Sequence, residues 1–192
     1  GYLRLRGRRD PAYLAHLGER FGYYSKPLPG AVWVHAVSLG EMRSAAPLIR
    51  ALLDRGDRVV TTHFTPAGRA EAERAFAADI AAGRMRAVWV PFETGRAFRR
   101  FFRAFRPAFG LVMEVEIWPR MIMAARGAGV PLFLCNAQYP ERSFRRDTTR
   151  TGLRAEVMRG LAGAFVKSDL QAARFAAVGV PNIHVTGELR FD

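Results

Sequence analysis

Seven short apolar runs, rich in β-branched residues, alternate along the chain with longer Ala-, Arg- and Glu-rich segments of helical period. The runs cover residues 32–37, 58–62, 87–90, 110–113, 131–136, 164–167 and 183–186. They are apolar nearly throughout, as is typical of strands in a parallel sheet that helices cover on both faces. The sequence therefore predicts one doubly wound α/β domain.

The segments between these runs predict helices over residues 42–54, 66–78, 94–105, 119–128, 143–161 and 169–178. Gly56, Gly129 and Gly179 follow three of them, at the position where a left-handed residue ends a helix. No apolar run approaches the roughly 18 residues that a membrane-spanning helix needs. In such sheets ligands bind beyond the carboxyl ends of the strands, so the residues that follow each strand are the candidates for function.

The charge of the chain predicts an anionic partner. There are 30 Lys and Arg residues against 17 Asp and Glu, which gives a formal net charge of +13. A GC-rich genome favours arginine over lysine but does not explain the surplus over acidic residues. Nucleic acid, an anionic membrane surface and a phosphorylated substrate are the partner classes. The sequence has no recognisable nucleic-acid module, so we expect no nucleic-acid partner.

The single cysteine, Cys135, lies in an apolar run, which excludes an internal disulfide and argues against a cysteine-based zinc site. No other pattern in the sequence indicates a metal centre. Neither a dinucleotide-binding nor a P-loop glycine pattern is present.

The first apolar run leads through Ser38, Gly40 and Glu41 into a helix. Such a turn leaves backbone N–H groups free at the helix start, and these suit an anion or a polar substrate group. Glu41 would lie beside the ligand crevice. A carboxylate at that position can also simply complement the helix dipole.

A pair of carboxylates, Glu114 and Glu116, follows the fourth run. They project to the same side if the strand continues, and like charges at close range raise each other's pKa. In the alternative interpretation Glu116 caps the helix that begins at Pro119, and Glu114 pairs with an arginine.

Two segments predict arginine-rich surfaces. After the fifth run, arginines recur at four-residue spacing, at positions 142, 146, 150 and 154. In residues 94–106 one helix face carries phenylalanines that a core would bury, and the other positions carry five arginines. Each arginine set is either a solvated face or a surface for phosphate or membrane.

Four ordered motifs resemble the N-terminal domain of the 3-deoxy-D-manno-octulosonic acid (Kdo) transferase family. They are Val34-His35-Ala36-Val37-Ser38-Leu39-Gly40-Glu41, Glu114-Val115-Glu116-Ile117-Trp118-Pro119, Asn136-Ala137 with Arg142-Ser143-Phe144, and Gly187-Glu188-Leu189-Arg190-Phe191-Asp192. The resemblance extends from about Arg20 to the last residue. It implies a Rossmann-like domain, the N-terminal half of a GT-B glycosyltransferase.

The resemblance also implies a domain organisation. Residues 1–25 would be a lead-in segment after a membrane anchor that is missing here, and residues 26–192 the Rossmann-like acceptor-binding domain. The C-terminal domain that binds CMP-Kdo is absent from this chain. The expected location is the cytoplasmic face of the cell inner membrane.

The function implied is inverting transfer of Kdo from CMP-Kdo to a lipid A precursor, lipid IVA, in lipopolysaccharide biosynthesis. The isolated domain is expected to be inactive. Partners are the lipid acceptor, CMP-Kdo through the missing domain, and the anionic inner-membrane surface. No cofactor or metal is expected.

By resemblance Glu41 is the general base, and Glu114 and Arg190 stabilise the transition state. The candidate substrate-binding residues are Ser38, Gly40, Arg43, Glu116, Asn136, Arg142 and Ser143. Residues 138–140, Glu188 and Arg190 depart from the family pattern. These departures leave a second hypothesis open: a divergent, non-catalytic module of the same fold that binds anionic lipid or glycolipid.

Overall fold

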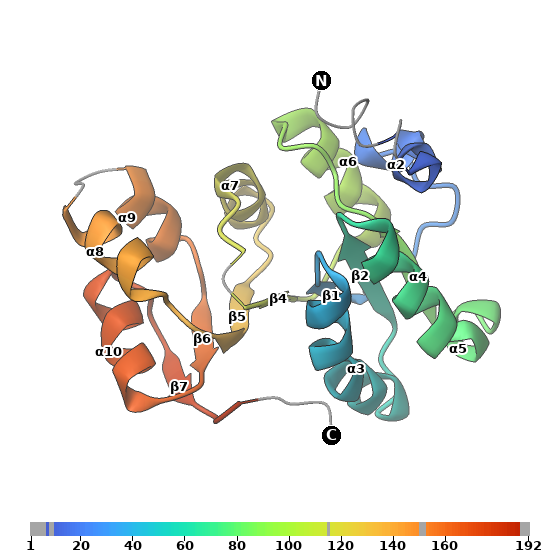
Figure 1. The fold of residues 1–192 in the computed structure, drawn as a ribbon. Coiled ribbons are helices and arrows are strands. Elements are labelled where there is room, and N and C mark those ends of the chain that lie inside the picture. Colours follow the sequence, from blue (N-terminus) through green and yellow to red (C-terminus); the bar gives the residue numbers. More distant parts are fainter. Residues whose placement is uncertain (1–6, 8–9, 115, 150–152, 189–192) are drawn as a thin grey trace.

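A computed structural model describes residues 7, 10–114, 116–149 and 153–188 (Figure 1). Its centre is a seven-stranded sheet in which every paired neighbour is parallel, with the strand order β3-β2-β1-β4-β5-β6-β7. The strands are β1 (Val32–His35), β2 (Val59–His63), β3 (Met85–Trp89), β4 (Gly110–Met113), β5 (Leu132–Ala137), β6 (Gly163–Val166) and β7 (Ile183–Val185). The predicted doubly wound parallel sheet is confirmed.

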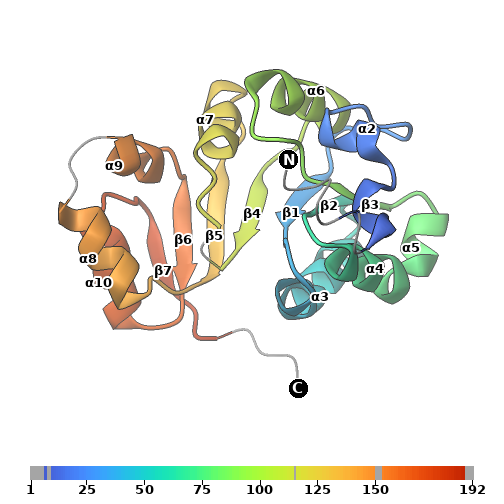
Figure 2. The same ribbon diagram turned by 45° about the horizontal axis from the view of Figure 1, so that its top comes forward.

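Helices cover the sheet in two layers, which Figure 2 shows on opposite sides of the strands. One layer contains α3 (Leu39–Asp54), α4 (Pro66–Ala75) and α5 (Ala77–Ala81). The other contains α6 (Gly95–Phe105), α7 (Pro119–Gly127), α8 (Glu141–Thr149), α9 (Leu153–Arg159) and α10 (Asp169–Ala177). The layers follow from right-handed crossovers: the chain builds the sheet in one direction from β1 to β3 and in the other from β4 to β7.

Each layer buries its own hydrophobic core. Along β1 the side chains alternate, so that Val32 and Val34 pack under α3, while Trp33 packs against α6 on the opposite face. The phenylalanines of α6, at positions 98, 101, 102 and 105, are all buried against the sheet. Their predicted role as core is therefore confirmed, and the arginines of this helix remain on its outer surface.

The chain before β1 packs directly against the edge of the sheet at β3. It contains a short 3-10 helix, η1 (Pro11–Leu14), and one helical turn, α2 (Leu17–Arg20). The indole N–H of Trp89 donates to the carbonyl of Ala15 (2.6 Å), and the backbone N–H of Trp89 donates to the Glu19 carboxylate (2.9 Å). In Figure 1 α2 lies beside α6.

Arg20 of this segment is completely buried. Its guanidinium lies over the rings of Trp89 (4.3 Å) and Phe64 (5.2 Å) and donates to the Phe64 carbonyl (3.1 Å). Burial and the neighbouring Arg69 lower the pKa of Arg20 to about 10. A guanidinium group stacks well on aromatic faces, and this contact partly offsets the cost of its desolvation.

Several helices differ from the sequence prediction. Helix α3 begins three residues earlier than expected, because Ser38 caps it. The predicted helix 66–78 is divided at Phe76, whose ring is buried and whose φ of −122° is not helical. The predicted helix 143–161 consists of α8 and α9, with residues 150–152 between them outside the described part. Gly56, Gly129 and Gly179 have φ of 94°, 68° and 88°, as predicted.

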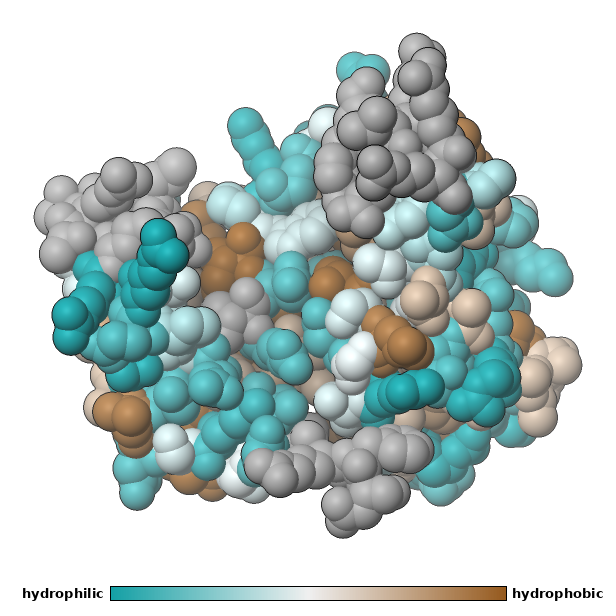
Figure 3. All heavy atoms as spheres, viewed as in Figure 1, coloured by the Kyte–Doolittle hydropathy of each residue, from teal (hydrophilic) through white to brown (hydrophobic). Residues whose placement is uncertain are grey.

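The surface is rich in polar side chains. On the face seen in Figure 3 hydrophilic residues predominate, and hydrophobic ones form small separate patches. Within the described residues, no helix combines the length and the apolar character needed to cross a membrane.

Candidate active site

The point where the strand order reverses brings two sequence motifs together. Strands β1 and β4 are neighbours, with His35 paired to Val112, and their following helices α3 and α7 lie on opposite faces of the sheet. In doubly wound sheets such a divergence forms a ligand crevice at the carboxyl ends of the two strands, and we call the corresponding place in this fold the crevice. Glu41 lies on one side of the crevice, and Glu114, Glu116 and Trp118 lie on the other. The charges of Glu116 and Glu114 are near enough to Glu41 to raise its pKa.

Glu41 is fixed by a reciprocal cap at the start of α3. The Ser38 hydroxyl accepts a hydrogen bond from the Glu41 backbone N–H (3.3 Å) and donates one to the Glu41 carboxylate (3.0 Å). The Val37 backbone N–H donates to the other carboxylate oxygen (2.8 Å). This is a capping-box arrangement, shifted by one residue at the backbone donor. The structural role considered for Glu41 is thus present, and it holds the carboxylate in one position.

The protonation of Glu41 differs from that of an ordinary glutamate. Glu41 is buried, with 6% exposure, and this burial is the largest cause that raises its pKa to about 7. The nearby Glu116 and Glu114 charges also raise the pKa, and the hydrogen bonds from Val37 and Ser38 oppose the rise. A carboxylate with this pKa exchanges a proton near neutral pH, which is what a general base requires. The cap and a role as base are therefore compatible.

Glu114 ends β4 in a strained conformation. Its φ is +55°, a left-handed value that non-glycine residues adopt rarely, and its side chain is exposed. The strand does not continue, so the condition under which Glu114 and Glu116 project to one side is not met. The Glu114 backbone N–H still donates to the Cys135 carbonyl on β5 (2.8 Å), which holds the turn at the crevice.

Glu116 is held by the next aromatic residue in the motif. The Trp118 indole N–H donates to the Glu116 carboxylate (2.6 Å), and the Trp118 ring packs edge-on against His35 (5.5 Å) and Phe64 (5.9 Å). The alternative in which Glu116 caps α7 is wrong, because the carboxylate that accepts from the first turn of α7, at Arg120 N, is that of Glu93 (3.0 Å).

A buried polar layer lies beneath the crevice. The Trp33 indole N–H donates to the Thr62 hydroxyl (2.8 Å), and Nδ1 of His35 lies 2.8 Å from the same oxygen. Burial, with the nearby His63, lowers the pKa of His35 to about 3. Burial also lowers the pKa of His63 to about 4, and its Nδ1 lies 2.8 Å from the Ala36 carbonyl. Both imidazoles are therefore neutral at physiological pH.

The remaining predicted site residues, apart from Arg190, lie on α3, β5 and α8. Gly40 is exposed in the first turn of α3, and Asn136, with φ of +53°, is buried at the end of β5 beside β4. Arg43 lies on α3 but forms an ion pair with Glu71 of α4 (3.6 Å). Arg142 and Ser143 are in the first turn of α8, exposed and half-buried respectively. Arg190 lies outside the described residues.

The described part of the chain contains no group of three or more His, Cys, Asp and Glu side chains placed to hold a metal ion. The anion-binding features of the crevice are backbone groups. The N–H groups of Leu39 and Gly40, in the first turn of α3, have no acceptor among the described residues. Such amides at a helix start favour a negatively charged ligand group.

Sequence reasoning missed Trp118, His35 and His63 as parts of the site. Trp118 belongs to the second of the four family motifs. Its indole N–H, the single donor group of the side chain, is close in sequence to two carboxylates, and this was the available signal. The two histidines end neighbouring strands, so their placement at the crevice could have been inferred from the strand order.

The fold and its switch point define a class, the doubly wound Rossmann-like α/β domains, whose ligands bind beyond the carboxyl ends of the strands. The solved structure of Glycyrrhiza uralensis UGT73P12, complexed with glycyrrhetinic acid 3-O-monoglucuronide, matches with a TM-score of 0.52. The match covers 83% of this chain and 49% of that one at 14% identity, which shows the shared fold alone.

The family is shown by sequence. Residues 15–192 match the family model described as 3-deoxy-D-manno-octulosonic-acid transferase, and the chain belongs to this family. The 3-deoxy-D-manno-octulosonic acid transferase of Bordetella pertussis is 43% identical over 182 residues, which is 95% of this chain and 42% of that protein. The Haemophilus influenzae transferase of the same name is 26% identical over 191 residues, with 96% and 44% covered. The chain thus spans less than half the length of these relatives.

Proposed function

We propose that this chain is the acceptor-binding half of an inverting glycosyltransferase that transfers Kdo from CMP-Kdo to lipid IVA, with Glu41 as the general base. The observation that carries the proposal is the Glu41 carboxylate, fixed at the switch-point crevice with a pKa raised to about 7. Membership of the Kdo transferase family supports the sugar that is transferred.

In the proposed reaction Glu41 accepts the proton of a sugar hydroxyl on the acceptor as its oxygen attacks the anomeric carbon of Kdo. The bond between that carbon and the phosphate oxygen breaks, and CMP leaves with the bonding electron pair. Attack and departure on opposite faces invert the anomeric centre, so no covalent intermediate forms. A base poised near the ambient pH contributes about 10²- to 10⁴-fold to such a step.

The other crevice residues hold the acceptor. We assign Glu116, fixed by Trp118, and Asn136 to acceptor hydroxyl groups, because the Glu116 charge is near Glu41 and Asn136 lies near the carboxyl end of β5, the strand beside β4. Glu114 and Arg190 are assigned to the transition state, and Ser38 orients the base. The leaving phosphate is stabilised by helix-start amides and basic side chains, without a metal.

Arg43, Arg142 and Ser143 are assigned to the acceptor phosphates. For Arg43 this requires the exposed guanidinium to exchange its 3.6 Å contact with Glu71 for the ligand. An exposed ion pair of that length is weak, so the exchange costs at most about 1 kcal/mol.

The donor and the membrane complete the proposal. CMP-Kdo binds a second domain. This chain itself contains neither of the glycine patterns that bind nucleotides. The acceptor is a phosphorylated lipid at the cytoplasmic face of the cell inner membrane. The net charge of +13 supports a negatively charged partner surface.

The test uses the full-length protein that carries this chain, with CMP-Kdo and lipid IVA, and mass spectrometry to detect the product. Glu41→Gln keeps the size of the side chain and removes the basic carboxylate, so we expect transfer to fall about a hundredfold or more, while lipid IVA binding is retained. Glu156→Gln, an exposed carboxylate on α9, is the control and keeps full activity. Undiminished transfer by Glu41→Gln removes Glu41 from its role. Lipid binding without any transfer by the unmodified protein favours a binding module.

A further inference from the structure

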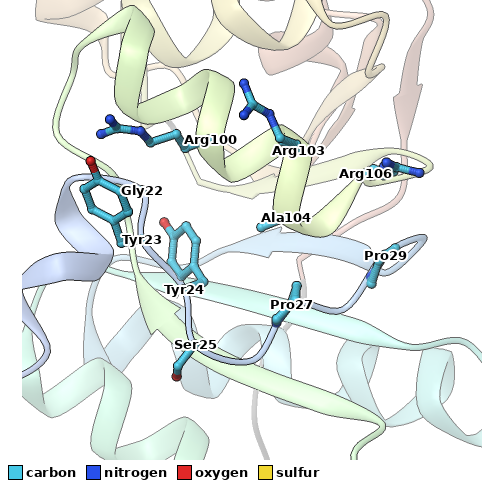
Figure 4. A pocket seen from close by; sticks show the side chains of 10 residues that line it. All are labelled: Gly22, Tyr23, Tyr24, Ser25, Pro27, Pro29, Arg100, Arg103, Ala104 and Arg106. Carbon is cyan, nitrogen blue, oxygen red and sulfur yellow. The ribbon is translucent and has the colours of Figure 1, made fainter.

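A second cavity lies on the outer side of α6, between this helix and the chain that leads into β1 (Figure 4). Its volume is about 740 Å³. Arg100, Arg103 and Arg106 line it from the helix, and Tyr23 and Tyr24 face them from the lead-in chain. None of the crevice residues contributes to it, so it is a separate site.

The two walls of this α6 cavity are fixed against each other. Gly22 has φ of +85°, and a Cβ at this position would lie 2.6 Å from the Ala97 carbonyl oxygen and 2.7 Å from the Arg100 Cβ. The backbone therefore approaches α6 as closely as only glycine allows. Arg100 completes the contact: its guanidinium donates to the Phe21 carbonyl (3.1 Å) and lies 4.1 Å from the centre of the Tyr23 ring.

Tyr24 is held on the inner side of the cavity. Its ring packs edge-on against Phe105 (4.9 Å) and Phe101 (5.8 Å), and its hydroxyl donates to the Trp89 carbonyl (3.2 Å). The aromatic wall is thus part of the core packing. A ligand that enters the α6 cavity meets preformed aromatic and guanidinium groups.

The positive charge of the cavity is not compensated within the described chain. Arg103 and Arg106 are exposed and have no acidic partner among the described residues, and α6 itself contains no Asp or Glu. On the opposite layer of helices arginines are paired: Arg50 and Arg84 with Asp79, and Arg74 with Glu71. The unpaired guanidinium groups therefore concentrate on the α6 side, where they favour an anion.

The side chains at the rim of the cavity indicate which kind of molecule carries that anion. Tyr23, 60% exposed, lines the cavity beside the arginines, and with Phe21, 47% exposed, it also lines a neighbouring hollow that contains Arg96 and Arg100. Aromatic side chains beside arginines are typical of surfaces at the boundary between lipid and water. A soluble phosphate would use the guanidinium groups but not this apolar rim.

We propose that the α6 cavity binds the phosphate group of an anionic phospholipid headgroup, with Arg103 and Arg106 as its ligands and Tyr23 and Phe21 in the headgroup layer. The inference deepens the proposed function, on which its membrane setting rests, and gives the membrane contact a defined site on the domain. The site is distinct from the crevice, so its loss affects membrane binding without changing the chemistry at Glu41.

The test is co-sedimentation of the chain with vesicles of phosphatidylcholine, with and without phosphatidylglycerol. The unmodified chain is expected to bind only the vesicles that contain phosphatidylglycerol. The double variant Arg103→Gln/Arg106→Gln should bind them about 25-fold more weakly, since each arginine near an anionic surface contributes about 1 kcal/mol. The charge-matched control Arg55→Gln/Arg74→Gln, on the opposite layer of helices, should lose much less.

Equal losses in the two double variants would show non-specific attraction and overturn the proposal. Failure of the unmodified chain to bind the vesicles would also overturn it. Inorganic phosphate is the competitor. If it displaces the chain from the vesicles at a concentration equal to that of the lipid phosphate, the site binds free phosphate and the proposal is overturned. Gly22→Ala, which changes no charge, should weaken vesicle binding as well, because it displaces Tyr23. Transfer assayed in detergent with full-length Arg103→Gln/Arg106→Gln should be unchanged, which separates this proposal from the proposed function.

Discussion

Replacing Gly22 by alanine tests the close contact between the lead-in chain and α6. The new Cβ would lie 2.6 Å from a backbone oxygen, that of Ala97, and 2.7 Å from the Arg100 Cβ, so one of the two segments must move. Forcing an extra carbon into a packed contact costs about 1–3 kcal/mol. The positive φ of +85° adds about 1–2 kcal/mol for any residue with a Cβ.

Gly56→Ala separates these two costs. Gly56 has a similar φ of +94°, but a Cβ there meets no atom within 4 Å. Both variants therefore carry the conformational cost, and only Gly22→Ala carries the clash. For a difference of about 2 kcal/mol, the melting temperature of Gly22→Ala should lie about 6 °C below that of Gly56→Ala. Equal melting temperatures in parallel thermal unfolding experiments would refute the claim that the lead-in chain is an integral part of this fold.

Two other predictions concern the polar groups at the crevice. Trp118→Phe keeps the ring contacts with His35 and Phe64 but removes the donor to Glu116, so kcat/KM of the full-length enzyme should fall about tenfold, with little loss of stability. An unchanged kcat/KM would mean that Glu116 needs no anchoring. Because the pKa values of buried His35 and His63 are lowered to about 3 and 4, their contribution to stability is present above the usual 6.5 and lost as pH falls toward the folded values. The raised pKa of Glu41 acts in the opposite sense, so urea unfolding should show a net loss of about 1.4 kcal/mol per pH unit between about pH 6.5 and 4.5. Constant or rising stability over that range would contradict the neutral, buried histidines.

The fold was largely predictable because its signals are local and repeated. Runs of apolar residues marked the strands along the chain, and a glycine after a helix marked its end, as at Gly56. The ends of elements were less predictable. Helix α3 starts at its cap, Ser38, and the break at Phe76 depends on where that ring finds space in the core. Both depend on tertiary contacts that a sequence window does not contain.

The site was predictable in position and less so in detail. The switch point places Glu41 and Glu114 together, which follows from strand order alone. The left-handed turn at Glu114 and the partner of Glu116 depend on the backbone after β4. The burial of Arg20 was not predictable from charge, because two aromatic rings from distant strand ends form its environment. The pairing of Arg43 with Glu71 likewise depends on how α3 and α4 pack.

The pH dependence of kcat/KM for Kdo transfer by the full-length protein tests the central claim most directly. With the pKa of Glu41 at about 7, about a tenth of the base is ionised at pH 6, so kcat/KM should fall about tenfold between pH 8 and pH 6, with a midpoint near 7. Glu116→Gln, which removes a like charge, should move that midpoint to lower pH. A kcat/KM that stays level down to about pH 5.5, as for a glutamate with its ordinary pKa of 4.5, would contradict a general base at Glu41.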